Sequence, residues 1–168
     1  RTAEEQCIAS TFSAATYAIT VYQILGEELG PERREQVLVA ENIFGEWAMK
    51  VAMKEMGLKE VKDIPTMAKL FQKTMNTFGD PCIISESSDD RAVVEMIFCK
   101  APMLGQTPWI SYMDMVKFCA GPGKIGYANF CSAFPKMCGL GDKVEGKLTH
   151  AMCLGEGPTC RTVFERIS

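Results

Sequence analysis

Hydrophobic residues recur at three- and four-residue steps through the first half of the chain, a spacing that places them on one face of an α-helix. The pattern predicts helices over residues 3–29, 32–56 and 63–79. A T-A-E-E stretch fits a capping box at the start of the first helix, and Gly57 fits the C-terminal cap of the second. The first half is therefore expected to be a layer of long helices.

The hydrophobic period changes after residue 80. Residues 82–87 and 91–99 are short and rich in β-branched side chains, and the S-S-D-D stretch between them has the composition of a hairpin turn. Residues 143–153 and 160–167 read as a second pair of strands, joined by a loop with glycine and proline. Two antiparallel hairpins are therefore expected in the second half.

Two short helices are expected between these hairpins. One begins at Thr107, a suitable N-cap followed by proline, and stops at the Gly-Pro-Gly turn of residues 121–123. The other covers residues 125–134 and is expected to stop before Pro135. An N-terminal helical layer packed on an antiparallel sheet is the α+β class. We expect one domain over residues 1–168, with a helical half and a sheet half that share one core.

Composition narrows the functional classes. The 168 residues are 47% hydrophobic and 23% charged, as in a globular protein. The net charge of −3 and the lack of a basic stripe argue against nucleic acid as a partner. No run reaches the roughly 18 apolar residues of a membrane span, and the first residues lack a secretory pattern. We expect a cytoplasmic protein with no membrane partner, and the long amphipathic helices make a homodimer a candidate assembly.

The candidate chemistry lies near the C-terminus, where the single histidine, His150, precedes Cys153 and Cys160. Closing the loop between the two cysteines brings them together, which suits two ligands of a tetrahedral metal site or a disulfide. His150 can share an ion with Cys153 only if the strand bulges or ends between them, because residues three apart on a strand face opposite sides. Cys119 is a suitable fourth ligand, and Cys131 and Cys138 compete with it for that position. A metal site, a thiol pair and plain packing all remain open.

The stretch I-G-Y-A-N-F-C-S-A-F at residues 125–134, with H-x-x-C-x6-C and the closing C-R-T-V-F-E-R, resembles the 4-vinyl reductase domain of bacterial sensors and bacteriochlorophyll enzymes. In that family a cysteine before a Gly-Tyr-Ala helix and a Glu-x-x-Cys…Cys strand pair hold zinc. The resemblance implies a zinc site made by Cys119, His150, Cys153 and Cys160, with His150 at the glutamate position. It also implies a domain that binds a small molecule.

The order of the long helices, the D-D-R-A-V-V-E-M-I-F-C stretch ending at Cys99 and the cysteine-bearing terminal hairpin are similar to L-2-amino-thiazoline-4-carboxylic acid hydrolases. This resemblance implies an enzyme that opens a cyclic amidine. Such a reaction needs a nucleophile or an activated water and a proton shuttle. Cys99 is then the candidate catalytic thiol and His150 the candidate base.

Three functions follow as hypotheses. The first is a zinc-containing module that binds an aromatic or heterocyclic ligand between rings of the two short helices, namely Trp109, Tyr112, Tyr127, Phe130 and Phe134. The second is the hydrolase. The third is an iron–sulfur protein in which Cys131 and Cys138 join Cys153 and Cys160 as cluster ligands.

Overall fold

The computed structural model describes residues 45–77, 80–97, 127–154 and 156–167, and for Cys153 it describes the backbone only. Residues 45–55 are helical. The elements that follow are α3 (Ile64–Thr77), β1 (Cys82–Ser87), β2 (Arg91–Met96), α6 (Tyr127–Met137), β3 (Val144–His150), the short 3-10 helix η1 (Met152–Leu154) and β4 (Cys160–Arg166). The predicted helices over residues 3–29 and from Thr107 lie outside the described residues.

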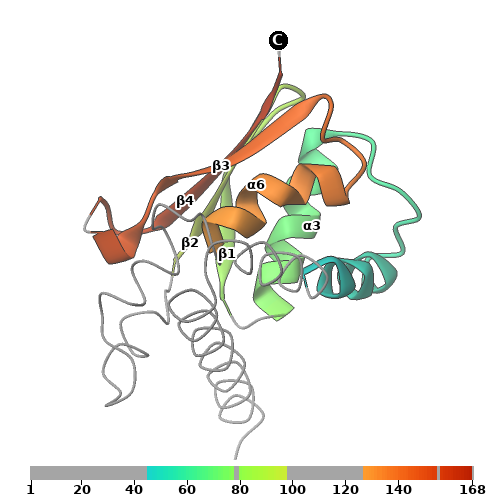
Figure 1. The fold of residues 1–168 in the computed structure, drawn as a ribbon. Helices are drawn as coiled ribbons and strands as arrows, with labels where there is room; N and C mark the ends of the chain where they lie inside the picture. Colours follow the sequence, from blue (N-terminus) through green and yellow to red (C-terminus); the bar gives the residue numbers. More distant parts are fainter. Residues whose placement is uncertain (1–44, 78–79, 98–126, 155, 168) are drawn as a thin grey trace, which may run out of the picture.

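The four strands form one antiparallel sheet in the order β1-β2-β4-β3. Both expected hairpins are therefore confirmed, and their second strands, β2 and β4, pair along the middle of the sheet. Helices α3 and α6 lie over the same face of this sheet (Figure 1), which we call the inner face. The opposite face is called the outer face. Helices on an antiparallel sheet confirm the expected α+β class.

Three aromatic rings from three different elements centre the core on the inner face. Phe71 of α3 packs edge-on against Phe134 of α6 and Phe164 of β4, with ring centroids 5.0 and 5.1 Å apart. All three side chains are fully buried. Edge-to-face pairs contribute about 0.5–1.5 kcal/mol beyond the area they bury. The rings thus fix both helices to the middle of the sheet.

Two predicted helix boundaries are correct, and at each one a capping hydrogen bond from a neighbouring residue sets the boundary. The Asp63 carboxylate accepts a hydrogen bond from the Thr66 backbone N–H at 2.7 Å, which caps the start of α3. The helical stretch of residues 45–55 is followed by a turn at Gly57, whose φ of 68° is left-handed. The N–H groups of Gly57 and Leu58 bond to the carbonyls of Lys54 and Met53, the pattern of a Schellman cap. The expected cap at Gly57 is confirmed.

Helix α6 continues past the expected stop. It runs through Pro135 to Met137, so the prediction that it ends before the proline was wrong. Its end is instead a second Schellman cap at Gly139, which has a φ of 77°. Proline has no N–H to bond the carbonyl of Cys131, four residues earlier. Gly146 of β3 lies against this carbonyl. A Cβ added to Gly146 would lie 2.2 Å from the Cys131 oxygen.

Strand β3 is shorter than predicted, because it ends at His150 rather than at Cys153. The pairing with β4 shifts between Leu148 and His150, and residues 152–154 turn as η1. The backbone N–H groups that leave the ladder find other acceptors. Ala151 donates to the Glu156 carboxylate at 2.8 Å, and Met152 donates to the Cys160 sulfur at 3.3 Å. These two hydrogen bonds replace the strand pairing that Ala151 and Met152 would otherwise make, and they stabilise the turn.

Candidate functional site

The strand register arranges the outer face in three rows of side chains, because residues directly opposite each other share a face of the sheet. The row nearest the β1–β2 turn holds Arg91, Glu165 and Glu145. The middle row holds Glu86, Val93, Val163 and Lys147. The last row, beside the β3–β4 loop, holds Ile83, Glu95, Arg161 and His150. Ionisable residues therefore dominate both ends of this face.

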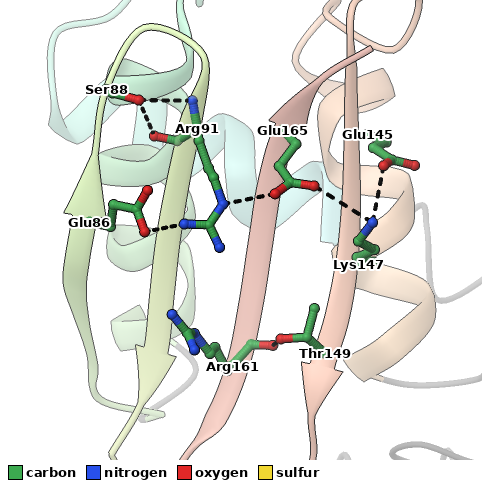
Figure 2. Close-up of polar contacts among 8 residues, drawn as sticks. All are labelled: Glu86, Ser88, Arg91, Glu145, Lys147, Thr149, Arg161 and Glu165. Carbon is green, nitrogen blue, oxygen red and sulfur yellow. Dashed lines mark hydrogen bonds and ion pairs between the residues drawn. The ribbon is translucent and has the colours of Figure 1, made fainter. Parts of the chain in front are cut away.

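The charges of the first two rows pair with one another. Arg91 Nε lies 2.8 Å from Glu165 Oε1, and the Arg91 guanidinium also bonds to Glu86. Lys147 Nζ lies 3.1 Å from Glu145 and 3.6 Å from Glu165 (Figure 2). Partly exposed pairs of this kind contribute about 0–1 kcal/mol each. Each of the five charges at this end of the face therefore has a partner of opposite sign.

The last row borders a hollow of about 290 Å³. Glu95 of β2, His150 of β3 and Arg161 of β4 line it together with the loop that joins β3 to β4, which contributes Glu156, Gly157, Pro158 and Thr159. The hollow thus straddles the seam between the two hairpins. We call it the Arg161 hollow.

Arg161 differs from the other arginines of the described residues. Arg91 and Arg166 bond to carboxylates, whereas the Nε of Arg161 is buried and has no hydrogen-bond partner within the described part of the chain. Figure 2 draws no hydrogen bond or ion pair from its guanidinium to the network around Arg91. Buried polar groups are almost always hydrogen-bonded. The Arg161 Nε is therefore the one buried side-chain nitrogen or oxygen of the described residues that lacks a partner among them.

Glu95 lies opposite Arg161 in the strand register, and each of its carboxylate oxygens is held by a hydroxyl group. Glu95 accepts hydrogen bonds from Ser85 Oγ at 2.8 Å and from Thr159 Oγ1 at 3.0 Å. These bonds, followed by the charges of Arg161 and His150, hold the pKa of Glu95 below its usual value. Glu95 is therefore a fixed anion that ties β1 and the β3–β4 loop to the wall of the hollow.

His150 reaches the hollow from the irregular end of β3. The ring is half-buried, and Nδ1 lies 3.2 Å from the hydroxyl of Thr149. That hydroxyl also donates to the carbonyl of Arg161 at 3.1 Å (Figure 2). Thr149 thus links the His150 ring to the backbone of Arg161.

The predicted zinc ligands are only partly placed by the structure. His150 is in register with Arg161, whereas Cys160 is the next residue along β4 and is buried on the inner face, 4% exposed. Because successive strand residues face opposite sides, the imidazole and this thiol lie on opposite faces of the sheet. Cys119 and the Cys153 side chain lie outside the described residues. No group of three or more His, Cys, Asp or Glu side chains within the described ranges could hold a metal ion, and the zinc set stays a prediction.

The aromatic residues predicted to line a ligand cavity pack in the core where they are described. Phe134 is fully buried, and Phe130 stacks on Phe71 with centroids 5.7 Å apart. The Tyr127 hydroxyl lies 2.9 Å from Thr162 Oγ1 in the interior. None of the three lines the Arg161 hollow. The other two predicted rings, Trp109 and Tyr112, lie outside the described residues, as does the candidate nucleophile Cys99.

None of the described cysteines forms a disulfide, namely Cys82, Cys131, Cys138 and Cys160. The first two and Cys160 lie within electrostatic reach of one another, whereas Cys138 lies apart beside Met49. Burial raises the pKa of Cys131 to about 12, and its sulfur lies 3.1 Å from Thr162 Oγ1. Burial also raises the pKa of Cys138 to about 12, and its thiol contacts Met49. Such thiols are protonated at neutral pH, whereas the thiolate is the nucleophile. The iron–sulfur set, which needs Cys131 and Cys138 at one cluster, stays a prediction.

Sequence reasoning missed Glu95 and Arg161. Alternation along C-R-T-V-F-E-R places Arg161, Val163 and Glu165 on one side of β4, which the sequence alone could have shown. The sequence does not show which acidic residue lies opposite each arginine, because that depends on the register between strands about 70 residues apart.

Comparison with known proteins assigns the chain to no family. No family model matches the chain, and no curated protein matches it with significant similarity. The resemblances to the vinyl reductase domain and to the thiazoline hydrolases therefore stay predictions. Within the described ranges, no helix combines the length and the apolar character needed to cross a bilayer.

Proposed function

We propose that this chain is a small-molecule-binding domain and that its ligand is a small heterocyclic acid held in the Arg161 hollow. The observation that carries the proposal is the buried, unpartnered Nε of Arg161 at the wall of that hollow. A guanidinium presents its donors as a planar fork that matches a carboxylate. The ligand carboxylate would supply the partner that the described residues do not.

Size and charge narrow the ligand further. A volume of about 290 Å³ is at the lower end of ligand pockets, so it accommodates one small ring rather than a nucleotide. The fixed anion of Glu95 faces the same space, and a neutral or cationic N–H on the ring would complement it. A ring that carries both an N–H group and a carboxylate therefore suits this hollow better than a purely apolar aromatic compound.

The test is a titration of the purified chain with heterocyclic carboxylic acids and their neutral amides, followed by calorimetry. The acids should bind and the amides should bind at least about tenfold more weakly, since a hydrogen bond to a charged group is worth about 1.5–3 kcal/mol. Arg161→Gln should remove this preference, and Arg161→Lys should restore it only in part because lysine lacks the fork.

Arg166→Gln is the matched control, because Arg166 lies on the same strand but pairs with Asp90 at 2.7 Å. It should leave ligand affinity unchanged. Equal binding of acids and amides, or undiminished affinity in the Arg161→Gln variant, would refute the proposal, as would the absence of saturable binding by every acid tested.

A second candidate function is the hydrolysis of a cyclic amidine, and the position of His150 favours it. The imidazole lines the hollow beside the bound ring that we propose, within the electrostatic reach of Glu95. A histidine there could act as general base for water that attacks the amidine carbon. Incubation with a 2-amino-thiazoline carboxylate tests this reading. Turnover that is abolished in His150→Gln supports it, and no ring opening by the wild-type chain rejects it.

Zinc has no role in this proposal, because His150 and Cys160 lie on opposite faces of the sheet. An ion shared by the two would require the end of β3 to rearrange. Elemental analysis of chain purified without chelators tests the zinc prediction separately from ligand binding.

A further inference from the structure

A second hollow, of about 430 Å³, is bordered by sulfur. Met53, Met137 and Cys138 line it together with Val61 and the polar residues Lys59 and Glu60. Met49 lies directly behind, where its Sδ accepts a contact from the Cys138 thiol at 3.7 Å. Two helical segments thus bring one thiol and three thioethers to one place, which we call the sulfur hollow.

The arrangement follows from local structure. Met49 and Met53 are four residues apart in the helical stretch 45–55 and so lie on one face of it. Met137 is the last residue of α6, and Cys138 follows it before the chain turns at Gly139. Met49 is buried, whereas Met53, Met137 and Cys138 are half-buried at the edge of the hollow.

Methionine often serves only to fill gaps in a core. Here three of the sulfur-bearing side chains border an open space instead of filling it. Thiolate and thioether ligands are soft and select soft ions such as copper(I), whereas oxygen ligands select hard ions. The sulfur-rich wall of this hollow therefore matches a soft metal ion.

We propose that the sulfur hollow binds a single copper(I) ion through Cys138, Met53 and Met137, with Met49 as a further thioether ligand. Sulfur ligands stand about 2.3 Å from a tetrahedral ion, which places any two of them about 3.8 Å apart. The distance of 3.7 Å between Cys138 Sγ and Met49 Sδ already has that value. Met53 and Met137 border the same space, and the three flexible bonds of methionine allow their sulfurs to adjust to an ion.

Charge balance also fits this site. Cys138 forms no disulfide, so its thiol is available as a ligand. The ion replaces the thiol proton: the S–H bond breaks, a sulfur–copper bond forms, and one proton leaves to solvent. The thiolate and the monovalent ion together carry no net charge, so the product can remain half-buried at little cost in desolvation. Lys59 and Glu60 are the other ionisable groups in the wall.

The experiment is an anaerobic titration of the full chain with copper(I) against a chromogenic chelator, followed by NMR of ¹³C-methyl-labelled methionine. The first equivalent should shift the methyl signals of Met49, Met53 and Met137, and it should leave those of the core residues Met67 and Met75 unchanged. Signals are assigned with single Met→Leu variants. One proton per ion should be released into weakly buffered solution.

Variants separate this site from the other cysteines of the chain. Cys138→Ala should abolish the three methyl shifts, and Met53→Leu or Met137→Leu should weaken binding by roughly tenfold or more. Met67→Leu is the matched control, since it makes the same chemical change in the core and should leave affinity unchanged. If Cys138→Ala does not fold, the two Met→Leu variants still decide the matter. The proposal is overturned if the first equivalent leaves the three methyl signals unmoved, or if these variants bind as tightly as the wild type.

Discussion

Gly146→Ala is expected to destabilise the protein strongly, because β3 lies too close to α6 at Gly146 to admit a side chain. The added Cβ would lie 2.2 Å from the Cys131 carbonyl oxygen and 2.9 and 3.0 Å from two ring atoms of Phe164. A carbon and an oxygen in contact are normally about 3.3 Å apart or more. The oxygen belongs to the backbone of α6, so it cannot rotate away. Relief therefore requires the helix to move by about 1 Å away from β3.

The size of the effect follows from this clash. Overpacking a core typically costs about 1–3 kcal/mol, and a backbone clash belongs at the upper end of that range. Replacing glycine also stiffens the unfolded chain, which offsets about 0.4–1 kcal/mol. The free energy of unfolding should therefore fall by about 2–2.6 kcal/mol. For a chain of this length that corresponds to a decrease of roughly 5–10 °C in Tm.

Urea unfolding followed by far-UV circular dichroism measures this difference. The midpoint should fall by about 1 M while the slope is unchanged, given slopes of about 1–3 kcal/mol/M. Gly157→Ala is the matched control, because a Cβ at that position meets nothing within 4 Å, and its effect should stay within about 0.5 kcal/mol. The reasoning is refuted if Gly146→Ala unfolds at the same urea concentration as the wild type, or if both glycine variants lose stability equally.

Two further predictions concern the buried polar groups. Stability should be full below about pH 8.5, the thiol pKa of an unfolded chain, and should decrease as the pH rises towards 12. The cause is burial, which raises the pKa of Cys82, Cys131 and Cys138 to about 12, so the unfolded state loses protons that the folded state keeps. Urea midpoints from pH 7 to 10 measure this, and a flat profile would contradict it. Thr162→Val should cost about 1–3 kcal/mol, because it removes the oxygen that partners the Tyr127 hydroxyl and the Cys131 thiol; the same substitution at exposed Thr149 should cost much less, and equal costs would count against this reading.

The sequence predicts best those parts of the fold that depend on neighbouring residues. Asp63 begins α3 and Gly57 ends the preceding helix because each acts within its own turn. The helix end at Gly139 was missed because Pro135, a usual stop, is tolerated here where β3 approaches the freed Cys131 carbonyl with a glycine. That compensation comes from a distant strand, so no local pattern reveals it.

The candidate site was predicted less well than the fold. Through His150 the sequence pointed to the loop end of the β3–β4 hairpin, where the Arg161 hollow lies. It grouped this residue with cysteines and not with Glu95 and Arg161. Cysteine spacing along a chain does not show on which side of a strand each thiol lies. The register shift between Leu148 and His150 decides that the imidazole faces Arg161, and irregularities of this kind are set by the loop contacts of residues 151–160.

The sheet order has a consequence for how the protein reaches its native state. Each hairpin closes over a few residues or a short loop, whereas β2 and β4 must meet across about 70 residues of chain, and such long-range pairing is slow. Glu95 and Arg161 stand on opposite sides of that junction, so the Arg161 hollow exists only after the hairpins have docked. A ligand that bridges the junction would oppose its opening, and would thereby lengthen the lifetime of the folded chain.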